Sequence, residues 1–356
     1  MTLTPVDRAG LRTRVEQALD AFLAARRQQL GAIDDGLLPV ADAIRAFVLG
    51  GGKRLRPAFA YWGYRGAGGV DSDAVVATLA ALELVQASAL IHDDVMDASD
   101  TRRGEPAIHR RFADRHAAAG WHGAAERFGT AAAILLGDLC LIWSDEMWHG
   151  GGLDPATLAR ARPVFDEMRT EVTAGQYLDI LAQASRDTSL ERASKIARYK
   201  SAKYTVERPL LVGAAIADAP PPVLRAYSAY GLPLGEAFQL RDDILGVFGD
   251  PTQTGKPAGD DLREGKRTYL VAAAFERAGP AERAVLAEHL GDPALDDAGV
   301  ARLREIITRT GALARTEARI AELADTALAA LATVDLDPQG AAVLTALASA
   351  ATRREI

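Results

Sequence analysis

The segment VVATLAALELVQASALIHDDVMD, residues 75–97, is the clearest indication of the class of structure. Its apolar residues recur every three or four positions, as they do along one face of a helix. Asp71 or Ser72 stands where a helix N-cap is expected. The segment therefore predicts a long apolar helix that ends in three carboxylates, at Asp93, Asp94 and Asp97.

The same helical spacing of Ala and Leu continues through most of the chain, and alternating β-branched runs are scarce. Clusters of helix-breaking residues separate segments that are long enough to be helices; they lie at 50–52, 150–152, 220–222, 249–259 and 335–340. No linker divides two halves of different composition. We predict an all-α protein, a single large bundle of roughly ten or more helices. It is expected to form one domain over residues 1–356, with a disordered N-terminus at residues 1–15.

The composition excludes several functional classes. The chain has 356 residues, of which 49% are hydrophobic, so it can bury a large core. Its net charge of -7 argues against a general nucleic-acid surface. Cys140 is the single cysteine, which excludes an intramolecular disulfide and fits a cytoplasmic protein. We expect no signal peptide and no transmembrane segment, since no uninterrupted apolar run reaches about 18 residues.

The first acidic cluster has the pattern of a metal and phosphate site. Asp93 and Asp97 are four residues apart and share a helix face, with Asp94 beside them. Oxygen ligands suit Mg²⁺, which binds through a few carboxylates together with substrate phosphates. Arg102 and Arg103 follow, and guanidinium groups match phosphate oxygens. The alternatives are a solvated helix end and a surface cluster of ion pairs.

Two further segments carry similar groups. Asp242 and Asp243 form a second acidic pair, and Gln239 shares a face with Asp242. The glycine-rich loop that follows contains Lys256 and Lys266, and its backbone could approach an anion. Near the N-terminus, Gly51-Gly52-Lys53-Arg54-Leu55-Arg56-Pro57 places three cations after glycines. Read alone, each segment could equally be an ordinary charged surface loop.

Taken in order, these segments resemble the trans-isoprenyl diphosphate synthase family. Gly51 to Pro57 resembles its GGKRxRP motif, and Asp93 to Asp97 resembles its first aspartate-rich motif, with Arg102 to His109 matching the RRGxPxxH that follows. The other matches are Gly175-Gln176 with Asp179 (GQxxD), Lys200-Ser201 (KT), Phe238 to Asp243 (the second aspartate-rich motif) and Thr254 to Thr268 (TGKPxGxDLREGK). Each motif is weak alone, but the ordered set is very specific and covers roughly residues 45–270.

The resemblance implies a magnesium-dependent prenyltransferase of isoprenoid biosynthesis, a helical bundle around a central substrate cavity. An allylic diphosphate would lie between the two acidic motifs, bridged by about three Mg²⁺ ions. Its ionisation would leave an allylic cation, which the double bond of isopentenyl diphosphate attacks before a proton is lost. The implied catalytic residues are Asp93, Asp94, Asp97, Arg102, Lys200, Asp242 and Asp243, with Asp93, Asp97 and Asp242 as first metal ligands. The allylic diphosphate would be held by Arg102, Lys200, Ser201, Gln239, Lys256 and Lys266, and isopentenyl diphosphate by Gly52, Lys53, Arg56, Gln86 and Arg103.

The sequence departs from the family pattern at two positions. Gly246 replaces the last aspartate of the second acidic motif, which leaves fewer carboxylates for metal. Ser201 replaces the usual threonine and keeps a hydroxyl group.

The spacing along residues 82–97 also predicts product length. Gln86, Ala89, Asp93 and Asp97 form one helical stripe, and each turn descends about 5.4 Å. A growing prenyl tail would pass Ala89 and Val85, and Ser88 and Ala89 are small. Family members that stop at farnesyl often carry aromatic residues here. We therefore expect geranylgeranyl diphosphate; small residues that only permit close helix packing are the alternative.

Other functions remain open at this stage. A farnesyl or a longer-chain polyprenyl diphosphate synthase is the nearest alternative. A class I terpene cyclase also uses DDxxD, but it needs no isopentenyl diphosphate site and fits the Gly51 to Arg56 segment poorly. A non-catalytic subunit of a heteromeric synthase would be expected to lose its acidic motifs. The resemblance also implies a homodimer.

Overall fold

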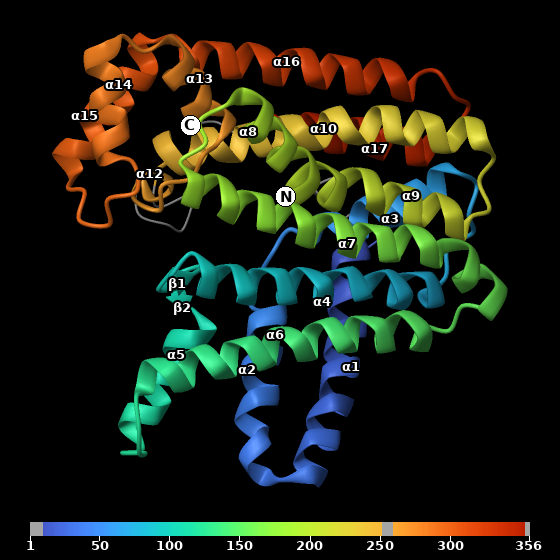
Figure 1. Cartoon of the computed structure of the whole chain (residues 1–356). Coiled ribbons are helices and arrows are strands. Elements are labelled where there is room, and N and C mark those ends of the chain that lie inside the picture. Colours follow the sequence, from blue (N-terminus) through green and yellow to red (C-terminus); the bar gives the residue numbers. More distant parts are fainter. Residues whose placement is uncertain (1–9, 251–258, 353–356) are drawn as a thin grey trace. The chain divides into compact units, whose positions relative to one another are not determined.

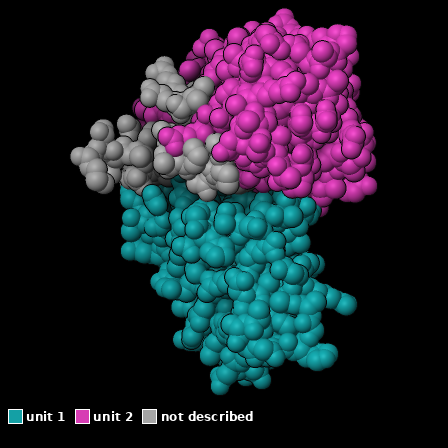
Figure 2. Space-filling model, turned by 90° about the vertical axis from the view of Figure 1, so that its left-hand side faces the viewer, with its two compact units in different colours: residues 1–61, 70–159 teal, residues 62–69, 160–356 magenta. Residues whose placement is uncertain are grey.

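The protein is almost entirely helical over the residues that the computed structural model describes, 10–250 and 259–352 (Figure 1). The prediction of an all-α fold is therefore confirmed. The chain divides into two compact units, unit 1 with residues 1–61 and 70–159 and unit 2 with residues 62–69 and 160–356 (Figure 2). The single domain and the central cavity both stay predictions.

Unit 1 contains the first acidic motif. Its elements are α1 (Leu11–Ile33), η2 (Asp35–Leu37), α2 (Leu38–Leu49), the first part of α3 (Leu55–Gly66), α4 (Asp73–Met96), β1 (Thr101–Arg102), β2 (Glu105–Pro106), α5 (Ile108–Ala118), α6 (Ala125–Gly150) and the start of α7 (Pro155–Ser185). Helix α4 packs against α1 and α6, and α6 packs against α5 (Figure 1). The two strands form a short antiparallel hairpin that the sequence did not predict.

Helix α4 is the core of unit 1, because it buries residues on most of its surface. Of the two predicted N-cap residues, Ser72 is the one that caps this helix. Its side chain accepts a hydrogen bond from the backbone N–H of Val75. Helix α1 begins at Leu11 and buries a stripe at every fourth residue that includes Leu11 and Val15. Residues 11–15 are therefore helical and packed, whereas the sequence placed them in a disordered N-terminus; residues 1–9 lie outside the described part.

Unit 2 contains the second acidic motif. Its remaining elements are α8 (Leu190–Ile196), the π-helix η3 (Ala197–Glu207), α9 (Arg208–Ile216), α10 (Pro221–Phe248), α12 (Asp260–Arg263), α13 (Tyr269–Arg277), α14 (Pro280–His289), α15 (Asp297–Arg309), α16 (Ala312–Leu331) and α17 (Pro338–Thr352). Helix α10 is central and packs against η3, α16 and α17. The buried hydroxyl of Tyr227 donates to the carbonyl of Gly63, and that of Tyr230 to the carbonyl of Leu344. The predicted helix breakers stand at the ends of helices, and the segment beyond Pro280 is helical as expected.

Two helices are long and apolar enough to cross a membrane by length and composition alone. In α4, 72% of the apolar window is buried, as in the core helix of a water-soluble protein. In α6, only 39% of the corresponding window is buried. The absence of a transmembrane segment therefore stays a prediction.

Candidate active site

The first acidic motif lies at the carboxyl end of α4. Asp93 and Asp97 are partly exposed one turn apart, whereas Asp94 is fully buried. The helix ends here because Ala98 adopts a left-handed backbone with φ 52°, and the N–H of Ser99 donates to the carbonyl of Asp94. The predicted face with Asp93 and Asp97 is therefore present, but Asp94 points into the protein.

Arg102 explains the burial of Asp94. Its Nε and Nη2 both donate to Oδ1 of Asp94, the first at 2.8 Å, and Nη2 lies 3.6 Å from Oδ2 of Asp93. Arg102 is carried by β1, and the hairpin turn at Arg103-Gly104 has positive φ at both residues. Gly104 was the only sequence signal of this turn. The hairpin folds the predicted arginines back onto the end of α4.

The glycine loop before α3 receives Arg103 from the hairpin. Gly51 and Gly52 have φ of 125° and 113°, which L-residues with a side chain rarely adopt. Nη1 of Arg103 donates to the carbonyl of Gly51 at 3.0 Å. Lys53 is exposed and Arg56 is partly exposed. Of the five residues assigned to isopentenyl diphosphate, Gly52 and Lys53 thus lie on this loop, Arg103 contacts it, and Arg56 stands in the first turn of α3 that follows.

The helical stripe along which the prenyl tail is predicted to pass is also present on α4. Gln86 and Ala89 are partly exposed, like Asp93 and Asp97, so one stripe of α4 is not packed into the core. Ser88 and Val85 are buried. Of the three residues assigned to chain length, Ala89 is the one that is partly exposed, one turn below Asp93, and the assignment itself stays a prediction.

The second acidic motif lies near the end of α10. Asp242 is partly exposed, and Asp243 is buried. Nε2 of Gln239 donates to Oδ1 of Asp243 at 2.7 Å, so Gln239 orients this carboxyl group. Arg241 donates to both oxygens of Glu317 on α16, each at 2.6 Å, and anchors the motif to that helix. Sequence reasoning missed this anchor because its two residues are far apart in the chain.

The surroundings of Asp243 favour the protonated form of its carboxyl group. Its pKa is raised to about 8, chiefly by burial and also by the nearby carboxylates of Asp261 and Asp242. The hydrogen bond from Gln239 and the charge of Lys266 act in the opposite direction. Asp242, which is partly exposed, is the more accessible acidic group of the pair.

Helix α12 brings a third carboxylate to this motif. Gly246 stands where the family has its last aspartate, and the carboxylate of Asp261, from α12, fills the space that a side chain at Gly246 would need. Nζ of Lys266 lies 3.2 Å from Oδ1 of Asp261 and 2.5 Å from Oε2 of Glu264. The predicted residue Lys256 lies outside the described residues.

Lys200 and Ser201 lie on the π-helix η3, a rare form of helix that is frequently found at functional sites. The wider π-helix fits because its neighbours lack side chains. A Cβ on Gly175 of α7 would lie 2.7 Å from Cα of Lys200, and one on Gly235 of α10 would overlap Ala202. Nζ of Lys200 donates to Oδ2 of Asp179 at 2.6 Å, which gives the aspartate of the GQxxD motif a defined partner.

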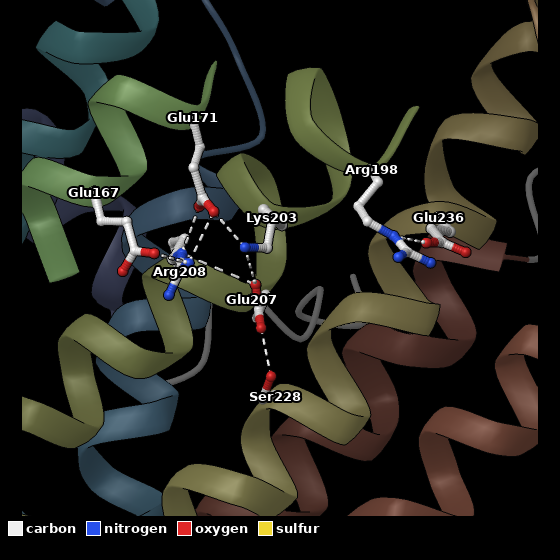
Figure 3. A network of polar contacts seen from close by, with 8 residues as sticks. All are labelled: Glu167, Glu171, Arg198, Lys203, Glu207, Arg208, Ser228 and Glu236. Carbon is white, nitrogen blue, oxygen red and sulfur yellow. Dashed lines mark hydrogen bonds and ion pairs between the residues drawn. The ribbon is translucent and has the colours of Figure 1, made fainter. Parts of the chain in front are cut away.

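A buried polar network holds the far end of η3 in place (Figure 3). Glu171 of α7 accepts hydrogen bonds from Lys203 and from Nε of Arg208, the latter at 2.7 Å. Ser228 of α10 donates to Glu207. Burial raises the pKa of Glu171, but the hydrogen bonds from Arg208 and Lys203 outweigh it and leave the pKa below its usual value.

The acidic side chains suit a Mg²⁺ ion that is bound partly by a diphosphate better than one that is enclosed entirely by protein ligands. Mg²⁺ usually takes one or two carboxylates and completes its shell with water and phosphate. Asp93 and Asp97 in unit 1, and Asp242 in unit 2, are partly exposed carboxylates of this kind. Over residues 10–250 and 259–352, no three acidic, His or Cys side chains gather into a metal site on their own.

Comparison with known proteins agrees with this geometry. The model of the family described as polyprenyl synthetase matches residues 39–307. The geranylfarnesyl diphosphate synthase of Aeropyrum pernix is 34% identical over 276 residues, 76% of this chain and 79% of that protein. The geranylgeranyl diphosphate synthase of Methanosarcina mazei is 33% identical over 259 residues, 71% of this chain and 74% of that protein.

A solved structure is similar over nearly the whole chain. The crystal structure of geranylgeranyl pyrophosphate synthase from Corynebacterium glutamicum, complexed with isoprenyl diphosphate and magnesium, matches with a TM-score of 0.94 and 42% identity, covering 97% of this chain and 99% of that one. The helical fold and its ordered motifs are thus those of a trans-prenyltransferase. The chain belongs to the polyprenyl synthetase family, as the motifs predicted.

Proposed function

We propose that this trans-prenyltransferase condenses isopentenyl diphosphate with allylic diphosphates and makes geranylgeranyl diphosphate. The observation that carries the product assignment is the partly exposed stripe on α4, in which the small residue Ala89 lies one turn from Asp93. Relatives named for geranylgeranyl and for geranylfarnesyl products support a chain longer than farnesyl. A farnesyl or a longer polyprenyl product is the alternative.

Asp93, Asp97 and Asp242 would hold Mg²⁺, with about three ions expected from the family resemblance. When bound, the metal would neutralise the negative charge that develops on the leaving diphosphate. The donor set described above supports this proposal, as does the magnesium in the similar Corynebacterium glutamicum enzyme.

The cations assigned to the allylic diphosphate are already oriented by carboxylates. Arg102 is held by Asp94, Lys200 by Asp179 and Lys266 by Asp261. Orientation before binding lowers the cost of placing these groups on the leaving diphosphate. Ser201 and Gln239 would add hydrogen bonds to the same diphosphate, and Lys256 a further charge. As the C–O bond breaks, its electron pair leaves with the diphosphate and an allylic cation remains.

Isopentenyl diphosphate would bind at Gly52, Lys53, Arg56, Gln86 and Arg103 without metal. These residues come from the glycine loop, α4 and the hairpin of unit 1. Holding the second substrate aligned lets its double bond attack the cation before water does. The new C–C bond forms, and the proton that is then lost passes to the released diphosphate.

We also propose that the protein is a homodimer that pairs through α6 and acts in the cytoplasm. Leu135 and Ile142 are seven residues apart on one face of α6, and they are 62% and 61% exposed. Ile134 and Leu141 widen this apolar stripe. Monomeric water-soluble proteins rarely leave large contiguous apolar patches uncovered. A free, buried Cys140 is compatible with a reducing compartment.

One assay tests the activity and the product together. Purified protein is supplied with isopentenyl diphosphate, Mg²⁺ and, in separate reactions, dimethylallyl, geranyl or farnesyl diphosphate. We expect geranylgeranyl diphosphate to accumulate from each accepted starter. A product of a different chain length would overturn the product assignment. Hydrocarbon released from geranylgeranyl diphosphate alone would instead indicate a cyclase.

A further inference from the structure

Arg54 differs from the other cations of the glycine loop because it points into the protein. Its exposed fraction is 3%, whereas Lys53 is exposed and Arg56 is partly exposed. Its backbone is left-handed with φ 50°, a conformation that costs an arginine free energy. A strained, buried arginine in a solvated loop needs a compensating partner.

That partner is Glu83 on α4. Nη1 of Arg54 donates to Oε2 of Glu83 at 2.8 Å, and Glu83 is only 6% exposed. Oε1 of Glu16, on α1, lies farther away, 3.5 Å from Nε, and Glu16 is partly exposed. The ion pair with Glu83 is therefore the main contact that fixes Arg54.

The pair joins the loop to the helix face that carries Gln86. Glu83 and Gln86 are three residues apart on α4, so they lie on neighbouring positions of one face. A Cβ on Gly52 would lie 3.4 Å from Nη1 of Arg54 and 3.2 Å from Nη2 of Arg103. The two guanidinium groups thus flank Gly52, one from within the loop and one from the hairpin.

The charges around Gly52 favour an anion. The pKa of Arg103 is lowered, first by the protein packed around it and second by the positive charge of Arg54. The side chain of Arg103 nevertheless keeps contact with solvent. Arg102 and Arg56 act in the same direction, and Glu83 opposes them. Glu83 can therefore hold Arg54 without cancelling the positive field at the loop.

We propose that Arg54 is a positioning residue, which with Glu83 fixes the glycine loop and thereby aligns Gly52, Lys53 and Arg56 with Gln86 for the diphosphate of isopentenyl diphosphate. This inference rests on the proposed function. Arg54 acts through the loop and not on the reacting carbon atoms. Loss of the pair should weaken the metal-free substrate site selectively and leave the binding of the allylic substrate unchanged.

The test uses Glu83→Gln, which keeps the shape of the side chain but removes its charge, and Arg54→Gln with Arg54→Lys as its conservative partner. We expect Glu83→Gln and Arg54→Gln to raise KM for isopentenyl diphosphate roughly tenfold or more. KM for farnesyl diphosphate should change less than about twofold. Arg54→Lys should recover part of the loss. Glu16→Gln is the matched control and should behave as wild type.

Two results would overturn the inference: an unchanged KM for isopentenyl diphosphate, or an equal rise in KM for both substrates. Thermal unfolding identifies variants that fail to fold. If Arg54→Gln fails to fold, Glu83→Gln, which is the milder change, still tests the inference. Direct calorimetry of isopentenyl diphosphate binding without Mg²⁺ gives a second readout. Failure of the proposed function is recognised separately, because wild type would then condense no allylic starter at all.

Discussion

The carboxylate of Asp261 occupies the space beside Gly246, so that any side chain at position 246 would overlap Oδ2 of Asp261. Gly246 is the residue that stands in place of the last aspartate of the second acidic motif. The missing carboxylate therefore has a spatial counterpart 15 positions later in the chain. This counterpart also contacts Lys266 and lies near enough to Asp243 to raise its pKa.

Restoring the family aspartate should consequently be harmful. We expect Gly246→Asp to lower the free energy of unfolding by about 1–3 kcal/mol through overpacking, and to lower kcat. The double variant Gly246→Asp with Asp261→Ala should recover part of both losses, because the overlap is removed. Chemical denaturation and steady-state kinetics measure these effects.

The control for this change is Gly150→Ala in α6, since a Cβ at Gly150 meets no atom within 4 Å. It should be nearly neutral. If Gly246→Asp is as stable and active as wild type, the side chain of Asp261 moves easily and the two positions are not coupled.

Asp93 and Asp94 should respond differently to the loss of charge. Asp94 is buried against Arg102, so Asp94→Asn should cost about 3 kcal/mol of stability or more. Asp93→Asn should leave the melting temperature within a few degrees of wild type but raise the Mg²⁺ concentration needed for half-maximal activity. Thermal melts and Mg²⁺ titrations of both variants check this. Equal Mg²⁺ requirements for wild type and Asp93→Asn would contradict the role given to Asp93.

Bulk at Ala89 should shorten the product. Ala89→Phe would place an aromatic ring one turn below Asp93, where the tail is proposed to pass. We expect farnesyl diphosphate to replace geranylgeranyl diphosphate as the main product, as measured by chromatography of the dephosphorylated alcohols. Ile33→Phe adds the same ring at an exposed residue of α1, away from this stripe, and should leave chain length unchanged. If Ala89→Phe also leaves the chain length unchanged, this stripe does not set product length.

The polar network at the end of η3 should make the stability of the protein depend on pH in the acidic range (Figure 3). The pKa of Glu171 is lowered in the folded protein, so its contribution is present above the unfolded value, roughly pH 4.3, and is lost as pH falls through the lower folded pKa. Glu171→Gln should lower stability at pH 7 by about 3 kcal/mol, because it leaves Arg208 and Lys203 without their shared partner.

The difference between wild type and Glu171→Gln should shrink below roughly pH 4.3, which melts at several pH values can follow. Glu167 also pairs with Arg208, but its side chain is 54% exposed. Glu167→Gln is therefore the matched control, with an expected loss below about 1 kcal/mol. A constant difference between wild type and Glu171→Gln at all pH values would contradict the assignment.

The apolar stripe on α6 predicts how the protein assembles. Leu135→Asp with Ile142→Asp should convert a dimer into a monomer, measured by light scattering after size-exclusion chromatography. Ile33→Asp, at an exposed apolar residue outside α6, is the control and should stay dimeric. If wild type is monomeric and instead binds lipid vesicles through this stripe, the surface faces a membrane and the homodimer proposal fails.

Local periodicity and motif order were sufficient to predict the helical class, the helix breakers, the cap at Ser72 and the shared face of Asp93 and Asp97. These features depend on residues within a few positions of one another, and helical geometry relates such residues directly. The family followed from the order of the motifs, because no single motif was specific enough.

Only the tertiary structure showed that Arg54 is buried against Glu83 while Lys53 is exposed. It also showed that Asp94 forms an ion pair with Arg102. It also placed Asp261 against Gly246 and Arg241 against Glu317, and formed the hairpin and the π-helix. Each of these depends on a partner from another element, and the burial that makes one rotamer or ion pair favourable exists only after those elements pack. A charged residue in a sequence does not reveal which of its neighbours in space will compensate it.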